Sequence, residues 1–510
     1  NQNIRKTAPT AIPRSTRVTH EQPPPPAGEE AGLSTGNARG VLLLSHVGFS
    51  FMEDLVGTVA ARGLECYVLS SLPEPQHQGS RPAALADLAT DVHVTTGHVL
   101  TPHDVEEHLD RLRATGTEVR CCLTVWEGYR HLMALANARL GVPDLDEKQV
   151  LELRDKLTLR NRLADAGLSR GRASALTAET LDERRRDGGR YFVKPVSGIA
   201  SFGTFPLTAD TTWADLERIA AEARSDTVYS SVFTTRPGPG TTDQDPLSDP
   251  ATIPDPAVPE TYTDQVVTPG VEFLVEDYVQ GREFSFEVVV VDGEPHVVAV
   301  HEKCEVTETA DTVLEDACVS PPTSLSRDET AAGMRWVRDV LDVLDLAWGC
   351  FHVEARHSPS GWDLIEVNPR VGGSLISPSV AALTGGPGLL DLWLDSLLTA
   401  RRPAGFRTEL KRLSYTADGA PQGRHATFFR VFFADPGTIR EVGLNDDLPL
   451  PPVLSHILLE PGDVVPRSAR EVFLGQVLWS MERADREEIL PGLVPASERA
   501  IEIVYEKEHG

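Results

Sequence analysis

Two glutamates and an asparagine near residue 360 have the spacing that a divalent metal site on a β-hairpin requires. The stretch Gly349 to Leu375 reads GCFHVEARHSPSGWDLIEVNPRVGGSL. A hairpin with its turn centred near Ser360 places Glu354 opposite Glu366 and His352 opposite Asn368. Because strand side chains alternate, both glutamates and the asparagine then share one face. Opposed carboxylates repel unless a cation lies between them, and this oxygen-rich set suits Mg²⁺ above all.

Arg370 and two glycines follow this hairpin directly. Arg370 supplies a permanent positive charge with a fork of donors, and Gly372 and Gly373 allow a backbone to approach a bound group closely. The alternative interpretation is an exposed hairpin whose charged residues only face solvent, since short motifs recur by chance. The remaining parts of the chain must separate the two interpretations.

The composition predicts a multi-lobed globular protein. The chain has 510 residues, of which 40% are hydrophobic, and its formal net charge is −28. Such a charge argues against a nucleic-acid partner or an anionic membrane surface. We find no run of transmembrane length, no secretory signal and no C-x-x-C spacing among the six cysteines. These features favour a cytoplasmic protein with reduced thiols.

The order of apolar runs, turn residues and biased segments predicts an α/β fold with several lobes. Val41 to Leu44 begins a β-α-β pattern that is typical of an open parallel α/β domain. Helices are expected over 145–166, 211–223, 327–344 and 389–399, and near 474–487. The expected parts are a disordered Pro-rich leader (1–38), an N-terminal α/β domain (39–144), a small lobe (145–225), a flexible Pro/Asp-rich insertion (226–270), a central lobe (271–400) and a C-terminal lobe (401–510).

Two lysines and a small-residue loop precede the acidic hairpin in the sequence. Lys156 lies in a predicted helix, and Lys194 lies in a predicted strand that is followed by the Gly/Ser loop from Ser197 to Gly203. Lysines neutralise phosphates, and a small-residue loop offers backbone N–H groups to phosphate oxygens. Together with carboxylates that hold Mg²⁺, this set matches the requirements of a nucleoside triphosphate.

This ordered set of motifs resembles the ATP-grasp superfamily, from about Arg154 to Gly373. Within it, His352-Val353-Glu354 followed by E-x-N-P-R-x-G-G at Glu366 to Gly373 resembles carboxylate–amine ligases of the L-amino acid ligase kind. The resemblance implies an ATP-grasp fold with an N-terminal parallel domain, a small lid lobe and a C-terminal lobe with a mixed sheet. It also implies ATP and Mg²⁺ or Mn²⁺ as cofactors.

The resemblance further implies roles for individual residues. Arg370 would be catalytic, and Glu354, Glu366 and Asn368 would bind the metal. Contacts with ATP would come from Lys156, Lys194, Ser197, Gly198, Ser201, Gly203, Glu276, Asp277, Tyr278, Val279 and Glu283, with Glu276 at the adenine amino group. The substrate side would include Lys303, Glu315, Gly372 and Gly373.

The activity implied by the resemblance is formation of an amide or peptide bond. A carboxylate attacks ATP, and an amine then attacks the acylphosphate, releasing ADP and phosphate. The alternatives are activation of another acid, such as bicarbonate or a precursor, and a nucleotide-binding scaffold without turnover. Partners would be small molecules and a second copy of the chain in a homodimer. The sequence does not name the acid, the amine or the pathway.

Overall fold

The computed structural model describes residues 39–46, 52–72, 87–198, 203–225, 273–308, 313–466 and 472–506. All of them belong to one compact unit, residues 37–510. The predicted leader (1–38), the predicted insertion (226–270) and Ser201 all lie outside the described residues. Predictions about them therefore stay predictions.

The N-terminal part is the expected open parallel domain. Its four-stranded sheet has the order β3-β2-β1-β4, and the neighbouring strands pair in parallel. The strands are β1 (Arg39–Ser45), β2 (Glu65–Ser70), β3 (Asp91–Val94) and β4 (Glu118–Leu123). The helices are α1 (Met52–Ala60), α3 (Pro102–Ala114) and α4 (Arg130–Leu140), with the short turn η2 (Glu127–Tyr129) at the carboxyl end of β4.

The small lobe contains an antiparallel sheet of order β5-β8-β6-β7. Its strands are β5 (Ala173–Ala175), β6 (Tyr191–Pro195), β7 (Phe205–Pro206) and β8 (Phe273–Asp277), and its helices include α7 (Ala178–Arg186) and α8 (Trp213–Ser225). The prediction of one helix over 145–166 is wrong. Two helices occur, α5 (Glu147–Arg154) and α6 (Lys156–Asp165), because Asp155 leaves the helical region and caps α6 through Thr158 N. Lys156 is therefore the first residue of a helix.

The central lobe is built on an antiparallel sheet of order β13-β12-β9-β10-β11-β14-β18-β16 among the described residues. Its central strands are β9 (Arg282–Val291), β10 (Glu294–Glu308), β11 (Val313–Ser320), β12 (Gly349–Ser358) and β13 (Gly361–Asn368). The predicted hairpin turn between β9 and β10 is confirmed, since Asp292 and Gly293 both have positive φ.

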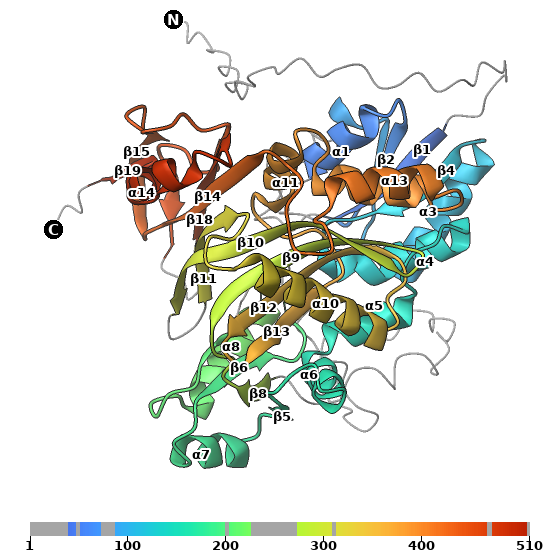
Figure 1. Cartoon of the computed structure of the whole chain (residues 1–510). Helices are drawn as coiled ribbons and strands as arrows, with labels where there is room; N and C mark the ends of the chain where they lie inside the picture. The colour runs from blue at the N-terminus through green and yellow to red at the C-terminus, as the bar shows by residue number, and fades with distance from the viewer. Residues whose placement is uncertain are drawn as a thin grey trace, which may run out of the picture. The chain divides into compact units, whose positions relative to one another are not determined.

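Helices cover the two faces of this sheet. In Figure 1, α10 (Arg327–Val343) lies across the face of β9, β12 and β13. Its apolar side packs on that face, where Phe286, Phe351 and Val353 belong to the same core as Val337 and Val340. The opposite face meets α11 (Ile376–Thr384) and α12 (Leu389–Thr399). The alternating residues of β12, namely Cys350, His352 and Glu354, therefore face away from α10.

The C-terminal region extends the same large sheet. It contains α13 (Ala404–Leu413), β14 (His425–Ala434), β16 (Leu454–Ile457), β18 (Val472–Glu482) and α14 (Arg486–Ser497), together with a smaller sheet of β15 (Gly437–Leu444), β17 (Val464–Val465) and β19 (Ile501–Tyr505). The predicted helix near 474–487 is wrong. This segment forms β18 between β14 and β16, and a strand buried on both faces shows a nearly continuous apolar run instead of alternation.

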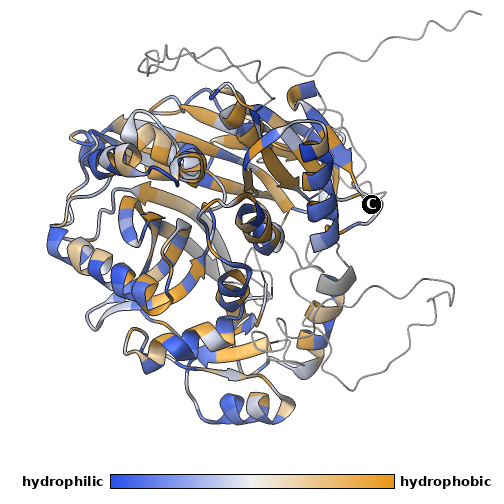
Figure 2. Cartoon of the chain, turned by 90° about the vertical axis from the view of Figure 1, so that its right-hand side faces the viewer, coloured by the Kyte–Doolittle hydropathy of each residue, from blue (hydrophilic) through white to orange (hydrophobic). Residues whose placement is uncertain are grey.

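Hydropathy follows the layers. Figure 2 shows strands that are mainly hydrophobic and helices with one hydrophilic and one hydrophobic side. Among the described residues, no helix combines the length and the hydrophobicity that crossing a membrane requires. The apolar surface is thus used mainly between the sheets and their covering helices.

Candidate nucleotide and metal site

The β12–β13 hairpin brings the two glutamates and the asparagine together as predicted, but through a different geometry. The turn is a two-residue turn, Pro359–Ser360, which pairs Ser358 with Gly361. Continued without interruption, this register would place Glu354 opposite Ile365. A bulge between Glu354 and Ala355 shifts the pairing, so that Glu354 lies opposite Glu366 and His352 opposite Asn368.

The bulge also decides the direction of the side chains. Leu364 and Val367 both belong to the core beneath α10. Residues of a regular strand would face that core at every second position, so the bulge adds one residue to the alternation. Glu366 and Asn368 therefore face the same side as Glu354. The interpretation as an exposed, solvated hairpin is wrong, because Glu354 is 8% and Asn368 is 3% exposed.

Lysine ammonium groups lie directly on the two carboxylates. Lys156 Nζ is 2.7 Å from Glu366 Oε1, and it donates to the carbonyl oxygen of Gly198 at 2.9 Å. Lys303 Nζ is 2.5 Å from Glu354 Oε1 and 2.7 Å from Glu283 Oε1. Burial opposes ionisation of Glu354, but Lys303 and His352 outweigh this effect and hold the pKa of Glu354 well below its usual value. Glu354 is thus charged, and each of the two carboxylates has a lysine ammonium group as its partner.

This donor set fits a hard divalent cation. Glu354 is buried and Glu366 is partly exposed, and the Asn368 amide lies beside Glu354, with Nδ2 donating to Glu354 Oε2 at 3.4 Å. Rotation of that amide would present its oxygen instead. Among the described residues, no group of three or more His, Cys, Asp and Glu side chains is arranged for a metal. That the two glutamates and the asparagine bind a metal stays a prediction.

A buried cluster of Glu287 and two histidines lies next to Glu354. Glu287 is completely buried between His352, whose Nδ1 is 2.9 Å from Glu287 Oε2, and His301, whose Nδ1 is 3.4 Å from Oε1. Burial alone would lower the pKa of His352, but the charge and hydrogen bonds of Glu287 and Glu354 raise it to about 10. His352 Nε2 lies 3.3 Å from Glu354 Oε1, so a protonated imidazole orients that carboxylate.

The segment predicted to hold adenine is tied into ion pairs. Glu276 is 4% exposed and contacts Lys194 Nζ at 2.5 Å and Arg160 Nε at 3.1 Å. Burial raises its pKa, but both cations outweigh this and leave the pKa of Glu276 below its usual value. The contact of Glu276 with adenine stays a prediction, and a ligand there would share this carboxylate with two cations.

The neighbouring residues Asp277 to Val279, also predicted to contact ATP, are held by further contacts. Arg356 Nε donates to Glu283 Oε2 at 2.9 Å, and its NH1 group donates to the carbonyl oxygen of Val279 at 2.7 Å. The Tyr278 ring lies between the guanidinium groups of Arg190 and Arg356. Asp277 accepts from the backbone N–H of Arg172 at 3.0 Å. The strand end that follows β8 is therefore held in place on both sides.

The predicted lid loop is described only at its ends. Ser197 and Gly198 follow β6, Ile199 to Phe202 lie outside the described residues, and Gly203 precedes β7. Gly203 has a φ of +67°, which favours glycine. The contact of Lys156 with Gly198 links this loop to the metal-side carboxylate Glu366. The lid role stays a prediction.

Arg370 is held by a residue from the N-terminal domain that the sequence reasoning missed. Arg370 Nε donates to Glu127 Oε2 at 2.8 Å, and its NH1 group donates to the carbonyl oxygen of Val371. Glu127 lies just after β4, at the carboxyl end of the parallel sheet, where α/β domains present ligand-binding residues. This position after a strand of the parallel sheet was the sequence signal that could have identified Glu127 as a candidate site residue. Arg130 adds a second link, since its Nε donates to Pro369 O at 2.9 Å.

The remaining substrate-side predictions are only partly placed. Gly372 lies against the His352 ring, where an added Cβ would be 2.7 Å from Nδ1, whereas Gly373 has open space around it. The backbone of Glu315 pairs with Val306 in the β10–β11 ladder. Lys303 lies between Glu283 and Glu354, on the metal side.

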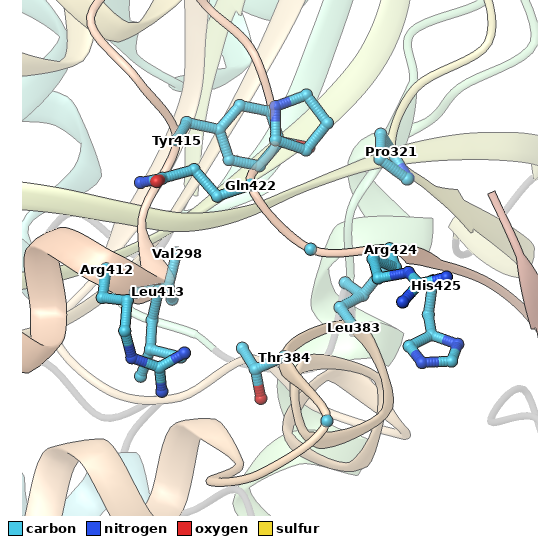
Figure 3. A pocket seen from close by; sticks show the side chains of 13 residues that line it. Val298, Pro321, Leu383, Thr384, Arg412, Leu413, Tyr415, Gln422, Arg424 and His425 are labelled. Atoms are coloured by element: carbon cyan, nitrogen blue, oxygen red, sulfur yellow. The ribbon is translucent and has the colours of Figure 1, made fainter. Parts of the chain in front are cut away.

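A separate cavity of about 280 Å³ opens near the end of α11 (Figure 3). Val298, Leu383, Leu413 and Tyr415 are its buried lining residues, and Arg412, Gln422, Arg424 and His425 are its more exposed ones. None of the residues predicted for the nucleotide or metal site lines it.

Comparisons with known proteins agree with this geometry. Residues 254–378 match the family model of the ATP-grasp domain. The fold is similar to that of L-amino acid ligase from Bacillus licheniformis, with a TM-score of 0.62 and 15% identity over 93% of this chain and 100% of that chain. Phosphoribosylglycinamide synthetase from Anaerococcus prevotii follows with a TM-score of 0.58 and 14% identity over 92% and 100%.

A biotin carboxylase domain of a single-chain bacterial carboxylase is also similar, with a TM-score of 0.56 and 14% identity over 92% of this chain and 90% of that chain. Comparison with curated protein sequences finds no match. At such identities the structural likeness establishes the fold, which is the ATP-grasp fold. The family model of the ATP-grasp domain adds a sequence match over residues 254–378 to this structural likeness.

Proposed function

We propose that this protein is an ATP-dependent ligase that joins a carboxylate to an amine through an acylphosphate, releasing ADP and phosphate. The observation that carries the proposal is the convergence of Glu354, Glu366 and Asn368 with Lys156 and Lys303 on one sheet face. The proposed substrates are amino acids or similar acids and amines, which is also the substrate class named for the L-amino acid ligase of similar fold.

The residues of the chain would divide the work as follows. Glu354, Glu366 and Asn368 would hold Mg²⁺ or Mn²⁺, which supplies positive charge to the phosphate oxygens of ATP. With a divalent ion bound there, the ammonium groups of Lys156 and Lys303 would be released from the carboxylates toward anionic oxygens.

Arg370 would stabilise the oxyanion that forms when the amine attacks the acyl carbon. Its pKa is raised although burial opposes this, because Glu127 lies against it, so the guanidinium remains charged in a buried position. Preorganised charge at such a position contributes several kcal/mol to the rate, on the order of 3 kcal/mol for one donor. Closure of the predicted lid loop, Ser197 to Gly203, would exclude water from the acylphosphate.

Two alternatives are distinguished by their products. An enzyme that activates bicarbonate or another precursor acid would share the fold, as the carboxylase domain of similar structure illustrates. A scaffold without turnover would bind nucleotide only.

The test is to incubate the protein with ATP, Mg²⁺ and pairs of amino acids and to quantify ADP, AMP and phosphate. Release of ADP and phosphate that needs both an acid and an amine supports the proposal. AMP with pyrophosphate would contradict the acylphosphate route, and nucleotide binding without any turnover would favour the scaffold.

A variant of the metal face tests the residue assignment. Glu366→Gln keeps the shape but removes the charge, and we expect loss of turnover with little loss of stability, about 1 kcal/mol, since the pair with Lys156 is partly exposed. Glu409→Gln, in an exposed pair with Arg412, is the control and should keep full activity. Full activity of Glu366→Gln would show that the metal assignment is wrong.

A further inference from the structure

Glu127, in the turn that follows β4, fixes one edge of the Arg370 guanidinium group. Its Oε2 accepts a hydrogen bond from Arg370 Nε at 2.8 Å, and the NH1 group of Arg370 donates to the carbonyl oxygen of Val371 at 3.0 Å. Among the described residues, the NH2 group of Arg370 donates to no acceptor. Because a guanidinium group carries five N–H donors, this second edge remains available to an anionic ligand.

Glu127 is itself held in place by buried contacts. It is 6% exposed and begins the short turn η2, at whose end the hydroxyl oxygen of Tyr129 lies 3.0 Å from His46 Nδ1. Tyr129 also accepts from the backbone N–H of Leu100 at 3.1 Å. Trp126, directly before the turn, stacks on the His46 ring with centroids 5.2 Å apart. Since both aromatic side chains and His46 are buried, the turn is anchored to the carboxyl edge of the parallel sheet.

The same turn also fixes the backbone next to Arg370. Arg130 directly follows the turn, and its Nε donates to the carbonyl oxygen of Pro369 at 2.9 Å. The terminal nitrogens of Arg130 bind both oxygens of Asp144, and the two side chains are 1% exposed. A buried pair with two parallel hydrogen bonds has a well-defined geometry. One segment of the N-terminal domain, residues 127–130, therefore holds both the side chain of Arg370 and the peptide before it.

We propose that Glu127 is a positioning residue that orients Arg370 for amide formation, an inference that rests on the proposed ligase function. When the amine nitrogen forms the C–N bond, the carbonyl electron pair moves onto the acyl oxygen, where the NH2 edge of Arg370 would stabilise it. The pair returns as the C–O bond to phosphate breaks, and the proton of the amine passes to solvent. Such a donor must be in place before the reaction, since an error of about 1 Å can cost on the order of 100-fold in rate.

The test compares Glu127→Ala, which removes the acceptor, with Glu127→Gln, whose amide oxygen can still accept from Arg370 Nε. Glu118→Gln is the matched control, because Glu118 begins β4 at the opposite end and is 50% exposed. We expect kcat for amide formation to fall about 10- to 100-fold in Glu127→Ala and less in Glu127→Gln, while KM for ATP stays within about 2-fold. Glu118→Gln should retain the wild-type kinetics.

The ratio of products separates positioning from a structural role. With Arg370 misplaced, the acylphosphate still forms, but the amine step slows and water competes for the acyl group. Glu127→Ala should therefore release several ADP for each amide, whereas wild type should release about one. A smaller folded fraction would lower both products in proportion. In the double variant Glu127→Ala/Arg370→Met, the loss should equal that of Arg370→Met alone, because Glu127 acts only through Arg370.

A second measurement does not need turnover. The Nε–H group of Arg370 is followed by heteronuclear NMR in protein labelled in its arginine side chains, and its signal is assigned by its absence in Arg370→Met. A hydrogen bond to a carboxylate should give wild type a downfield proton signal that exchanges slowly with water. In Glu127→Ala this signal should move upfield and exchange faster, with a smaller change in Glu127→Gln.

Four results would overturn the inference. They are an unchanged kcat in Glu127→Ala, losses of ADP and amide formation in equal proportion, losses that add in the double variant, and an Arg370 signal that does not respond to Glu127→Ala. If wild type releases no ADP with any acid and amine, the ligase proposal fails, and the Arg370 signal alone then decides whether Glu127 orients the guanidinium group.

Discussion

The buried triad His352–Glu287–His301 offers a quantitative test of the electrostatics behind the metal face. Glu287→Gln removes the charge and nearly preserves the shape. Burial raises the pKa of Glu287, but His352 and His301 outweigh this and lower it to about 2, against an ordinary value of 4.5. This difference in pKa corresponds to about 3 kcal/mol of folding free energy, because each pKa unit corresponds to about 1.4 kcal/mol. This agrees with the roughly 3–5 kcal/mol lost when a buried pair is broken on one side.

The dependence on pH follows from the direction of both shifts. The pKa of Glu287 is depressed, so its contribution is present above about pH 4.5 and is lost as the pH falls through about 2. The pKa of His352 is raised to about 10, so its contribution is present below the ordinary value and is lost as the pH rises through about 10. The difference between wild type and Glu287→Gln should therefore be largest near pH 5–6.5 and decrease outside that window.

Denaturant unfolding at several pH values between about 3 and 10 measures this difference. The control is Glu294→Gln, since Glu294 forms only long, partly exposed pairs with Arg407 and Lys411 and should cost less than about 1 kcal/mol. A Glu287→Gln variant within about 0.5 kcal/mol of wild type at pH 6 would refute the reasoning. A loss that does not vary with pH would instead indicate a packing effect.

Two further predictions concern backbone geometry near the site. Gly372→Ala should destabilise the protein by about 1–3 kcal/mol in thermal unfolding, since its Cβ would lie 2.7 Å from His352 Nδ1 and 2.8 Å from Ile376 Cγ1. Gly373→Ala, with nothing within 4 Å, should stay within about 0.5 kcal/mol, and equal effects of the two would contradict this geometry. Asp155→Ala should cost about 1 kcal/mol and weaken ATP binding, because the cap of α6 positions Lys156, whereas Asp155→Asn should retain most of the stability. An Asp155→Ala variant as stable as Asp155→Asn would show that the cap is unimportant.

The pairing of Glu354 with Glu366 shows how a correct prediction can rest on an incomplete reason. The sequence placed the turn near Ser360 and used uninterrupted alternation. In the protein, the two-residue turn moves the strand pairing by one position from the predicted register. The bulge at Ile365 moves it back by one position, so Glu354 again lies opposite Glu366. A bulge is difficult to predict from sequence, because it is stabilised by the tertiary contacts of the side chains on either side of it. Without it Glu366 would face the apolar core under α10.

Segments whose environment differs from their local pattern were predicted less well. The break at Asp155 was missed although aspartate three residues before Thr158 is a capping signal, because the apolar stripe continues on both sides of it. A helix was expected near residues 474–487, but residues 472–482 form β18. This strand lies between β14 and β16, and a strand buried on both faces loses the alternation that identifies strands.

The sequence by itself determined the fold class with its parallel N-terminal domain, and it predicted the residue set Glu354, Glu366, Asn368 and Arg370. These depend on local periodicity and on motifs whose members are close in the chain. Only the tertiary structure decided that Glu127 holds Arg370 and that lysines lie on Glu354 and Glu366. Ion pairs between distant segments depend on which charges are buried together, and burial is a property of the folded chain.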